Sequence, residues 1–145
     1  MDLPEYVTAE EVKRVCGELK IRDWTELEEN KVSLDEAKLI LSIVNIEGMD
    51  IDPEEFRSGL EVELEHGTEF KDANVTNNHP VLTGKIVLAH LKESLYYYKL
   101  LEVAELEGDL LKAVESEDLS KVKSLYVRLK NARMVLNQEE IERIG

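Results

Sequence analysis

The chain has 145 residues, with 18 Lys and Arg against 32 Asp and Glu, a net charge of −14 and 43% hydrophobic residues. This length fits one domain and is sufficient to bury a sizeable core. The acidity argues against direct binding to nucleic-acid phosphates, which needs clustered Lys and Arg to displace counterions. It argues against an anionic membrane surface for the same reason.

Other features of the sequence bear on the cellular compartment. Cys16 is the only cysteine, so an intramolecular disulfide is excluded. No apolar run approaches the ~20 residues that a membrane helix requires. The first residues are acidic and poor in apolar side chains, unlike a secretion signal. We therefore expect a cytoplasmic protein without a membrane partner.

Capping signals predict a series of helices in the first half of the chain. A Ser, Thr or Asp precedes a Glu by three positions, as in a capping box, at Thr8/Glu11, Asp23/Glu26, Ser33/Glu36 and Asp52/Glu55. Apolar residues at helical spacing follow these caps, and we expect only a short helix or turn after Asp23. Gly48 suits the C-cap of the Ser33 helix, and Gly67 is expected to end the helix that starts at Pro53.

The second half of the chain predicts longer helices. Residues 68–80 form an irregular stretch, and a helical pattern then runs from about Val81 to Glu115. A last helix follows residues 116–118. No alternating pattern is long enough to predict a substantial strand.

The predicted fold class is therefore all-α. We expect a single-domain bundle of five or six helices, with a long central helix and a C-terminal helical arm. The sequence divides into N-terminal helices at 1–48, a motif-bearing helix pair at 49–101 and a C-terminal helical extension at 102–145.

The helix after Pro53 carries a Glu and a His beside its apolar stripe. On a helical wheel of about 100° per residue, Phe56, Leu60 and Leu64 define the buried stripe. Glu63 lies in line with that stripe, and His66 follows three residues later along its flank. This placement singles out Glu63, because solvated carboxylates belong on the opposite face.

The helix after Val81 repeats the pattern in reverse order. Its apolar wheel positions predict a buried side marked by Leu82, Ile86, Ala89, Tyr97, Leu100 and Leu101. His90 and Glu93 fall on that same side. If the two helices pack antiparallel, His66 faces His90 and Glu63 faces Glu93.

Four such groups on apolar faces point to a divalent cation. Burying an unpaired carboxylate costs several kcal/mol or shifts its pKa until it protonates. Two imidazoles with two carboxylates suit Zn²⁺, Fe²⁺ or Mn²⁺. The expected metal ligands are Glu63, His66, His90 and Glu93.

Two further side chains lie near the expected ligands. Tyr97 lies one turn beyond Glu93 and would serve as a proton donor, or simply as a core tyrosine. Thr83 aligns with His90 and would orient a ligand, or bond its own helix backbone. An open coordination position would allow hydrolytic or redox chemistry, but the residues do not decide whether the protein is an enzyme.

Other interpretations stay open. Glu–His pairs between helices also form metal-free polar networks that hold helix register. The chain would then be a non-enzymatic acidic interaction module, forming a homodimer through the long helix and the helix at 120–136. A third interpretation is mimicry of nucleic acid against a basic partner, which predicts negative charge along one ridge.

The motif residues resemble a known family. Phe56–Gly67 reads FRSGLEVELEHG, and Leu82–Glu93 reads LTGKIVLAHLKE. These segments resemble the paired "ELEHG" and "TGKIxLAHLxE" motifs of a small domain of unknown function in archaea, bacteria and phages. The resemblance covers roughly 33–101, implies a shared role for Glu63, His66, Thr83, Lys85, His90 and Glu93, and supplies no activity. The family's proline is absent after Glu93, so we expect the second helix to continue unbroken.

Overall fold

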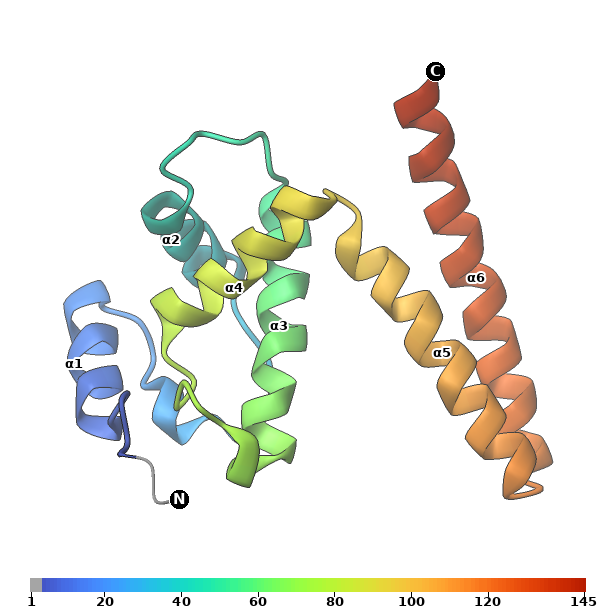
Figure 1. Ribbon diagram of the computed structural model, residues 1–145, viewed down its shortest axis with the longest axis horizontal. Helices are drawn as coiled ribbons and strands as arrows, with labels where there is room; N and C mark the ends of the chain where they lie inside the picture. Colours follow the sequence, from blue (N-terminus) through green and yellow to red (C-terminus); the bar gives the residue numbers. More distant parts are fainter. Residues whose placement is uncertain (1–3) are drawn as a thin grey trace. The chain divides into compact units, whose positions relative to one another are not determined.

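The computed structural model describes residues 4–145 as an all-α protein, which confirms the predicted fold class (Figure 1). Six α-helices and two short 3-10 helices make up this part of the chain, and it contains no β-strand. The elements are α1 (Ala9–Leu19), η1 (Trp24–Glu26), α2 (Leu34–Val44), α3 (Pro53–Glu69), η2 (Lys71–Ala73), α4 (Pro80–Glu93), α5 (Tyr97–Glu115) and α6 (Leu119–Ile144).

The contacts divide the chain into two compact units, Met1–Glu93 and Ser94–Gly145. We call them the N-terminal unit and the hairpin unit. The N-terminal unit contains α1 to α4, and the hairpin unit contains α5 and α6. None of the helices within residues 4–145 is both long and apolar enough to cross a membrane.

The predicted helix starts of the N-terminal unit are confirmed by their caps. Thr8 accepts a hydrogen bond from the Glu11 amide, and Ser33 forms a full capping box with Glu36. Pro53 occupies the first turn of α3, where its missing N–H costs nothing.

Two predicted helix ends are wrong. The C-cap of α2 is Asn45, and Gly48 instead supplies a positive φ of 69° in the turn that follows. Gly67 does not end α3, which continues to Glu69. A glycine inside a helix has another use there, namely close approach of a neighbouring segment, as described below.

The core of the N-terminal unit lies where α2, α3 and α4 pack against one another in pairs. Its fully buried side chains include Trp24, Ile40, Phe56, Leu60, Leu64, Val87 and Leu91. Gly84 on α4 lets the helices come close together, because an added Cβ would lie 2.5 Å from Ile40 Cγ2.

The predicted buried side of α4 is wrong. Ile86 and Ala89 are exposed, whereas the buried residues are Pro80, Thr83, Gly84, Val87, Leu88 and Leu91. The prediction treated residues on both sides of Glu93 as one helix, so Tyr97, Leu100 and Leu101 of α5 helped to define the buried side of α4. It also gave weight only to large apolar residues. Small residues at Thr83 and Gly84 mark the contact face instead.

The long central helix is also not observed, since α4 ends at Glu93 and α5 begins at Tyr97. The Tyr96 amide donates to Ser94 Oγ at 3.3 Å, and the Tyr97 amide donates to the Ser94 carbonyl at 3.0 Å. These local bonds replace the helical pattern. The chain therefore leaves the helix at Ser94, although it lacks the proline that the related family has at this point.

The hairpin unit is formed by α5 and α6, which pack along their length (Figure 1). Its core consists of Leu and Ala side chains: Leu106, Ala113, Leu125, Leu129 and Ala132. The α6 residues of this core recur at spacings of three and four, the coiled-coil pattern of a helical pair.

Candidate functional site

Two of the four predicted ligands come together in the structure. His90 Nε2 on α4 lies 3.5 Å from Glu63 Oε1 on α3. The Glu63 side chain is 12% exposed and the His90 side chain 31% exposed, so the pair lies at the edge of the packed helices. The sequence predicted that Glu63 faces Glu93 and that His66 faces His90, whereas the contact in the structure joins Glu63 to His90.

The other two predicted ligands lie on the surface. His66 and Glu93 are both exposed, so the prediction that Glu93 lies on the buried side of its helix is wrong. Within residues 4–145, no group of three or more His, Cys, Asp or Glu side chains is arranged to hold a metal ion. The four-residue ligand set therefore stays a prediction, with Glu63 and His90 as its nearest pair.

The two accessory candidates lie in different units. Thr83 is buried in α4, at 2% exposure. Tyr97 begins α5, and its ring contacts Tyr98 edge to face with centroids 5.2 Å apart. Their predicted roles as orienting group and proton donor stay predictions.

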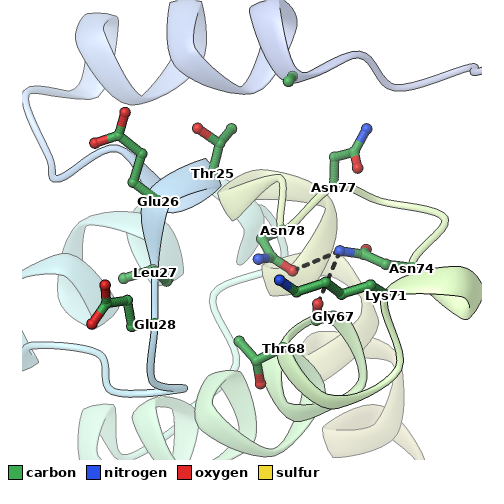
Figure 2. A pocket seen from close by; sticks show the side chains of 11 residues that line it. Thr25, Glu26, Leu27, Glu28, Gly67, Thr68, Lys71, Asn74, Asn77 and Asn78 are labelled. Atoms are coloured by element: carbon green, nitrogen blue, oxygen red, sulfur yellow. Dashed lines mark hydrogen bonds between the residues drawn. The ribbon is translucent and has the colours of Figure 1, made fainter.

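An open cleft of about 480 Å³ lies elsewhere in the N-terminal unit (Figure 2). Its lining comes from the start of α1, from η1 and the residues after it, from the end of α3, and from the segment 71–78. The lining residues are Ala9, Thr25, Glu26, Leu27, Glu28, Gly67, Thr68, Lys71, Asn74, Asn77 and Asn78. Most of them are polar.

Three asparagines hold one wall of this cleft in place. Asn74 Nδ2 donates to Asn78 Oδ1 at 3.1 Å and to the Gly67 carbonyl at 3.5 Å (Figure 2). Asn78 Nδ2 reaches the Trp24 carbonyl, and Asn77 Nδ2 donates to the Val7 carbonyl. The segment is therefore anchored to α3, to η1 and to the chain before α1.

The backbone of this segment explains its composition. Asn77 and Asn78 adopt positive φ angles of 48° and 60°, which Asn tolerates better than most residues. Gly67 is needed because an added Cβ would lie 1.9 Å from Asn78 Oδ1 and 2.7 Å from Asn74 Nδ2. Sequence reasoning found the irregular segment but not its contact with Gly67, since the contact depends on the tertiary path.

His79 caps α4, as its position before Pro80 favours. Its Nδ1 accepts hydrogen bonds from the amides of Val81 at 3.2 Å and Leu82 at 3.3 Å. Burial lowers the pKa of His79, and nearby Arg14 acts in the same direction, whereas the Glu11 carboxylate opposes the shift. His79 is therefore a structural residue that needs its neutral form.

Glu36 is a buried charged residue, which the sequence predicted only as the capping-box partner of Ser33. Burial raises the pKa of Glu36, but hydrogen bonds from Arg22, Ser33 and Trp24 outweigh it and bring the pKa to about 2. Arg22 Nη2 lies 2.7 Å from Glu36 Oε2, and Trp24 Nε1 donates to Oε1 at 3.3 Å. The only sequence signal was the Ser33 capping box.

The hairpin unit carries a second candidate surface. Along α5, positions Leu100, Ala104, Glu107, Leu111 and Val114 follow one another at spacings of three and four, and therefore share a flank. Along α6, Leu119, Tyr126 and Arg133 recur every seven residues, and Met134 and Ile141 lie beside them.

The Arg133–Glu107 ion pair joins these two flanks, so they form one face of the hairpin. The large apolar residues of this face are exposed, with Leu111 at 61%, Tyr126 at 52% and Met134 at 65%. We call it the apolar face and define it as Leu100, Leu111, Val114, Leu119, Tyr126, Met134 and Ile141. The opposite flanks carry the polar and charged residues Glu102, Asp109, Ser124, Arg128 and Glu142, together with the exposed Val135 of α6.

Comparison with known proteins places the chain in a family. A family model described as "Protein of unknown function (DUF5661)" matches residues 12–107. The chain belongs to this family. The match includes α3 and α4, and with them the Glu63–His90 pair, the cleft's Gly67–Asn78 wall and the His79 cap. No curated protein and no solved structure shows a significant match.

Proposed function

We propose that this DUF5661 protein is a non-enzymatic interaction module that self-associates through the apolar face of its hairpin unit. The supporting observation is the row of exposed Leu, Val, Tyr, Met and Ile side chains on one face of α5 and α6. Large apolar side chains exposed on one face of a helical pair, with an ion pair between them, favour an interaction site in a folded protein. The partner we propose is a second copy of the chain.

The size of the face suits a homodimer. At a rise of about 1.5 Å per residue, α5 and α6 extend about 28 and 39 Å. Two helices with axes about 9 Å apart present a face about 20 Å wide. The projected area is therefore on the order of 600 Å², close to the ~800 Å² that each partner contributes to a stable interface.

The charges of the two helices favour self-association over an unrelated partner. The segment Tyr97–Glu115 contains two Lys and five Asp or Glu, whereas Leu119–Ile144 contains six Lys or Arg and three Glu. A twofold axis that lays α5 of one copy on α6 of the other places the acidic helix against the basic one. The same arrangement buries both apolar faces in a four-helix bundle.

In this proposal the Glu63–His90 contact is structural. It joins α3 to α4 as a polar contact of 3.5 Å between His90 Nε2 and Glu63 Oε1, as in a metal-free polar network. The acidic balance of the chain supports a protein partner and continues to argue against direct binding of nucleic-acid phosphates.

Light scattering after size exclusion tests the proposal. We expect a mass of twice 16.6 kDa at a loading of about 50 µM, well above a micromolar Kd. Leu111→Glu should give the monomer, because it places a charge in the middle of the apolar face. Ser124→Glu adds the same charge on an exposed position of the polar flank and should leave the dimer intact.

A wild-type monomer at that loading would refute the proposal. So would a dimer that survives Leu111→Glu but not Ser124→Glu. Far-ultraviolet circular dichroism of both variants verifies that their helices remain folded, and Leu111 is exposed enough for this to be expected.

Divalent-metal binding is the second candidate function. Its supporting observation is the 3.5 Å between Glu63 Oε1 and His90 Nε2. Two ligands of one tetrahedral ion, with bonds of about 2.0–2.2 Å, lie about 3.3–3.6 Å apart. His66 and Glu93 would complete the set by rotamer changes of exposed side chains, with Zn²⁺, Fe²⁺ or Mn²⁺ as the ion.

Metal content separates the two candidates. Protein purified without chelators or affinity metals should contain about one equivalent of metal if a high-affinity site exists. His90→Gln should lose it, whereas His79→Gln should keep it. Less than about a tenth of an equivalent, unchanged after Zn²⁺, Fe²⁺ or Mn²⁺ is added, would exclude the metal function.

A further inference from the structure

Residues 94–96, the linker between α4 and α5, contain no residue that breaks helices, and neither Gly nor Pro occurs at positions 85–107. The break depends on Ser94, whose Oγ accepts the Tyr96 amide at 3.3 Å and whose carbonyl accepts the Tyr97 amide at 3.0 Å. The second bond joins residues three apart, as in a 3-10 turn. Tyr96 has φ −109° and ψ 21°, in the bridge region beside that of α-helices. The linker is therefore already close to a helical conformation.

The linker needs little free energy to become helical. Both of its flanks are helices, so the linker would extend existing helices and would need no new nucleus. Serine favours turns because its hydroxyl competes for nearby backbone amides. Here that competition is a single hydrogen bond, from the Tyr96 amide to Ser94 Oγ. A modest gain of burial elsewhere is therefore sufficient to convert the linker.

A stripe of apolar residues lies on the side of α4 that faces away from the core. Ile86 is 37% exposed, Ala89 is exposed and Leu82 is half-buried. Their spacings of four and three residues place them in one row along the helix. We call Leu82, Ile86 and Ala89 the α4 stripe. It extends only about 10 Å, which is too short for an interface of its own.

The α4 stripe comes into phase with the apolar face of the hairpin unit if the linker is helical. Leu100 follows Leu82 by 18 residues, and Ala104 follows Ile86 by the same number. Eighteen residues make about five turns at 3.6 residues per turn. The α5 flank of the apolar face would therefore continue the α4 stripe on the same side of one helix. The joined row would run from Leu82 to Val114, over about 48 Å.

Two carboxylates interrupt this joined row. Glu107 is paired with Arg133 of α6. Glu93 is exposed at the end of α4, where the row crosses into the linker. Single polar positions within an apolar helix seam fix the register of the pairing. The row is therefore compatible with a helix–helix interface along its full length.

The joined row also brings the proposed dimer closer to the area that a stable interface buries. The apolar face of the hairpin unit has a projected area on the order of 600 Å², against ~800 Å² for each partner of a stable complex. Positions 82–93 add about 18 Å of helix with a width of about 10 Å, hence on the order of 200 Å². A second copy is the partner that this continuity favours.

We propose that the linker is a helical switch: when two copies pair through the apolar face, residues 94–96 become helical and the α4 stripe joins the interface. This inference rests on the proposed self-association and adds the participation of α4. In the single chain, the linker keeps its Ser94 bonds and the α4 stripe stays exposed. The switch accounts for the periodicity of one helix over residues 81–115, which the single chain interrupts.

Backbone chemical shifts of the full-length protein test the switch. At about 50 µM, well above a micromolar Kd, we expect helical ¹³Cα shifts at Ser94, Leu95 and Tyr96 of the wild-type dimer. In the Leu111→Glu monomer, Ser94 should have a non-helical shift, because it lies outside both helices of the single chain. Dilution of the wild type below its Kd should give the same change.

Variants at Ser94 test whether the linker controls the affinity. Ser94→Ala removes the acceptor of the Tyr96 amide and raises helix propensity, so the dimer Kd should fall about tenfold. Ser94→Pro prevents a continuous helix and should raise the Kd about tenfold or more. Ser124→Ala makes the same exchange at an exposed position of α6 and should leave the Kd unchanged.

A charge in the α4 stripe tests whether α4 takes part in the interface. Ile86→Glu should raise the dimer Kd about tenfold or more, because the carboxylate would be buried at the joined row. Ile46→Glu is the matched control, since Ile46 is 90% exposed in the same unit but lies outside the stripe. It should bind like the wild type.

The outcomes separate this inference from the self-association on which it rests. A wild-type monomer at about 50 µM would refute both. A wild-type dimer in which Ser94 has the same shift as in Leu111→Glu would overturn the switch alone. So would a dimer Kd that Ser94→Ala, Ser94→Pro and Ile86→Glu all leave unchanged.

Discussion

The two units of this protein are stabilised in different ways. The N-terminal unit, residues 1–93, contains 22 Asp and Glu against ten Lys and Arg, whereas residues 94–145 contain ten against eight. The acidity of the chain is therefore almost entirely a property of the first unit. The buried polar residues of the described chain, Glu36, Asn78, His79 and Thr83, also lie in that unit.

The hairpin unit shows the opposite organisation. Its core is made of Leu and Ala at coiled-coil spacing, and its charges lie on the outside. Heptad packing tolerates many exchanges of similar side chains, whereas a buried polar network depends on each partner. We therefore expect the stability of the N-terminal unit to depend on pH and on small changes of geometry. The stability of the hairpin unit should depend mainly on its buried apolar side chains.

The largest expected effect tests whether the two units unfold separately. Leu60 is completely buried among α2, α3 and α4. Leu60→Ala should lower the free energy of unfolding of the N-terminal unit by about 3 kcal/mol, from lost burial and the cavity left behind. Native-state hydrogen exchange should show lower protection of core amides in the N-terminal unit but not of those in α5 and α6.

Leu129→Ala is the matched variant in the hairpin core, and it should reverse the pattern of lost protection. Equal loss of protection in both units, for either variant, would mean that the chain unfolds as one cooperative body and would remove the basis of the comparison.

The second effect uses the charged centre of the N-terminal unit. The pKa of Glu36 is about 2 in the folded chain, against an ordinary 4.5. Its carboxylate therefore stabilises the fold fully above pH 4.5, and this stabilisation is lost as the pH falls from 4.5 toward 2. Glu36→Gln should cost about 2 kcal/mol at pH 7 and flatten this part of the pH profile.

Denaturant unfolding at a series of pH values measures both effects. Asp35→Asn removes the neighbouring exposed carboxylate and should retain the wild-type acid profile. If Glu36→Gln keeps the same slope between pH 4.5 and 2, then Glu36 does not carry the acid sensitivity.

The third prediction compares a glycine from each unit. Gly67→Ala should destabilise the protein by about 1–2 kcal/mol, because the new Cβ would collide with the amide groups of Asn78 and Asn74. Gly108 lies exposed in α5 with nothing within 4 Å of an added Cβ. Gly108→Ala should therefore stabilise by about 0.5–1 kcal/mol through helix propensity.

Thermal unfolding of the two variants measures both effects: Gly67→Ala should lower the melting temperature and Gly108→Ala should raise it. Two shifts in the same direction would show that the crowding at Gly67 relaxes without cost. That result would weaken the view that the wall of the cleft is rigid.

The sequence predicted local structure better than it predicted contacts between segments. Caps such as Thr8 and Ser33 are local, since side chain and amide lie three residues apart, and they were found. The break at Ser94 was missed because a serine that bonds a nearby amide leaves no periodicity signal. The buried face of α4 was missed because Thr83 and Gly84 have small side chains that a hydrophobic wheel ignores.

The candidate sites show the same limit. The wheels selected Glu63 and His90 but paired Glu63 with Glu93 and His66 with His90. The observed contact between Glu63 and His90, and the exposure of His66 and Glu93, depend on the crossing of α3 and α4. The cleft depends on the path of residues 70–79, where Asn77 and Asn78 have positive φ angles. Such a path is set by bonds to Trp24 and Val7, more than 50 residues away, and no local pattern encodes it.

The smallest expected effect concerns the cap of α4. His79 can accept the Val81 and Leu82 amides at Nδ1 only while it is neutral, and burial lowers its pKa below the ordinary 6.5. As the pH is lowered below 6.5, the unfolded chain takes up a proton at His79 that the folded chain does not. The free energy of unfolding therefore decreases as the pH decreases in that range.

His79→Ala should cost about 1 kcal/mol at pH 7.5, as for other lost N-caps. His79→Asn keeps an acceptor without a titrating group, so the wild-type stability minus that of His79→Asn should decline from pH 7.5 to pH 5. A difference that stays constant over this range would show that His79 does not couple the N-terminal unit to pH, and Glu36 would then be left as its acid-sensitive buried group.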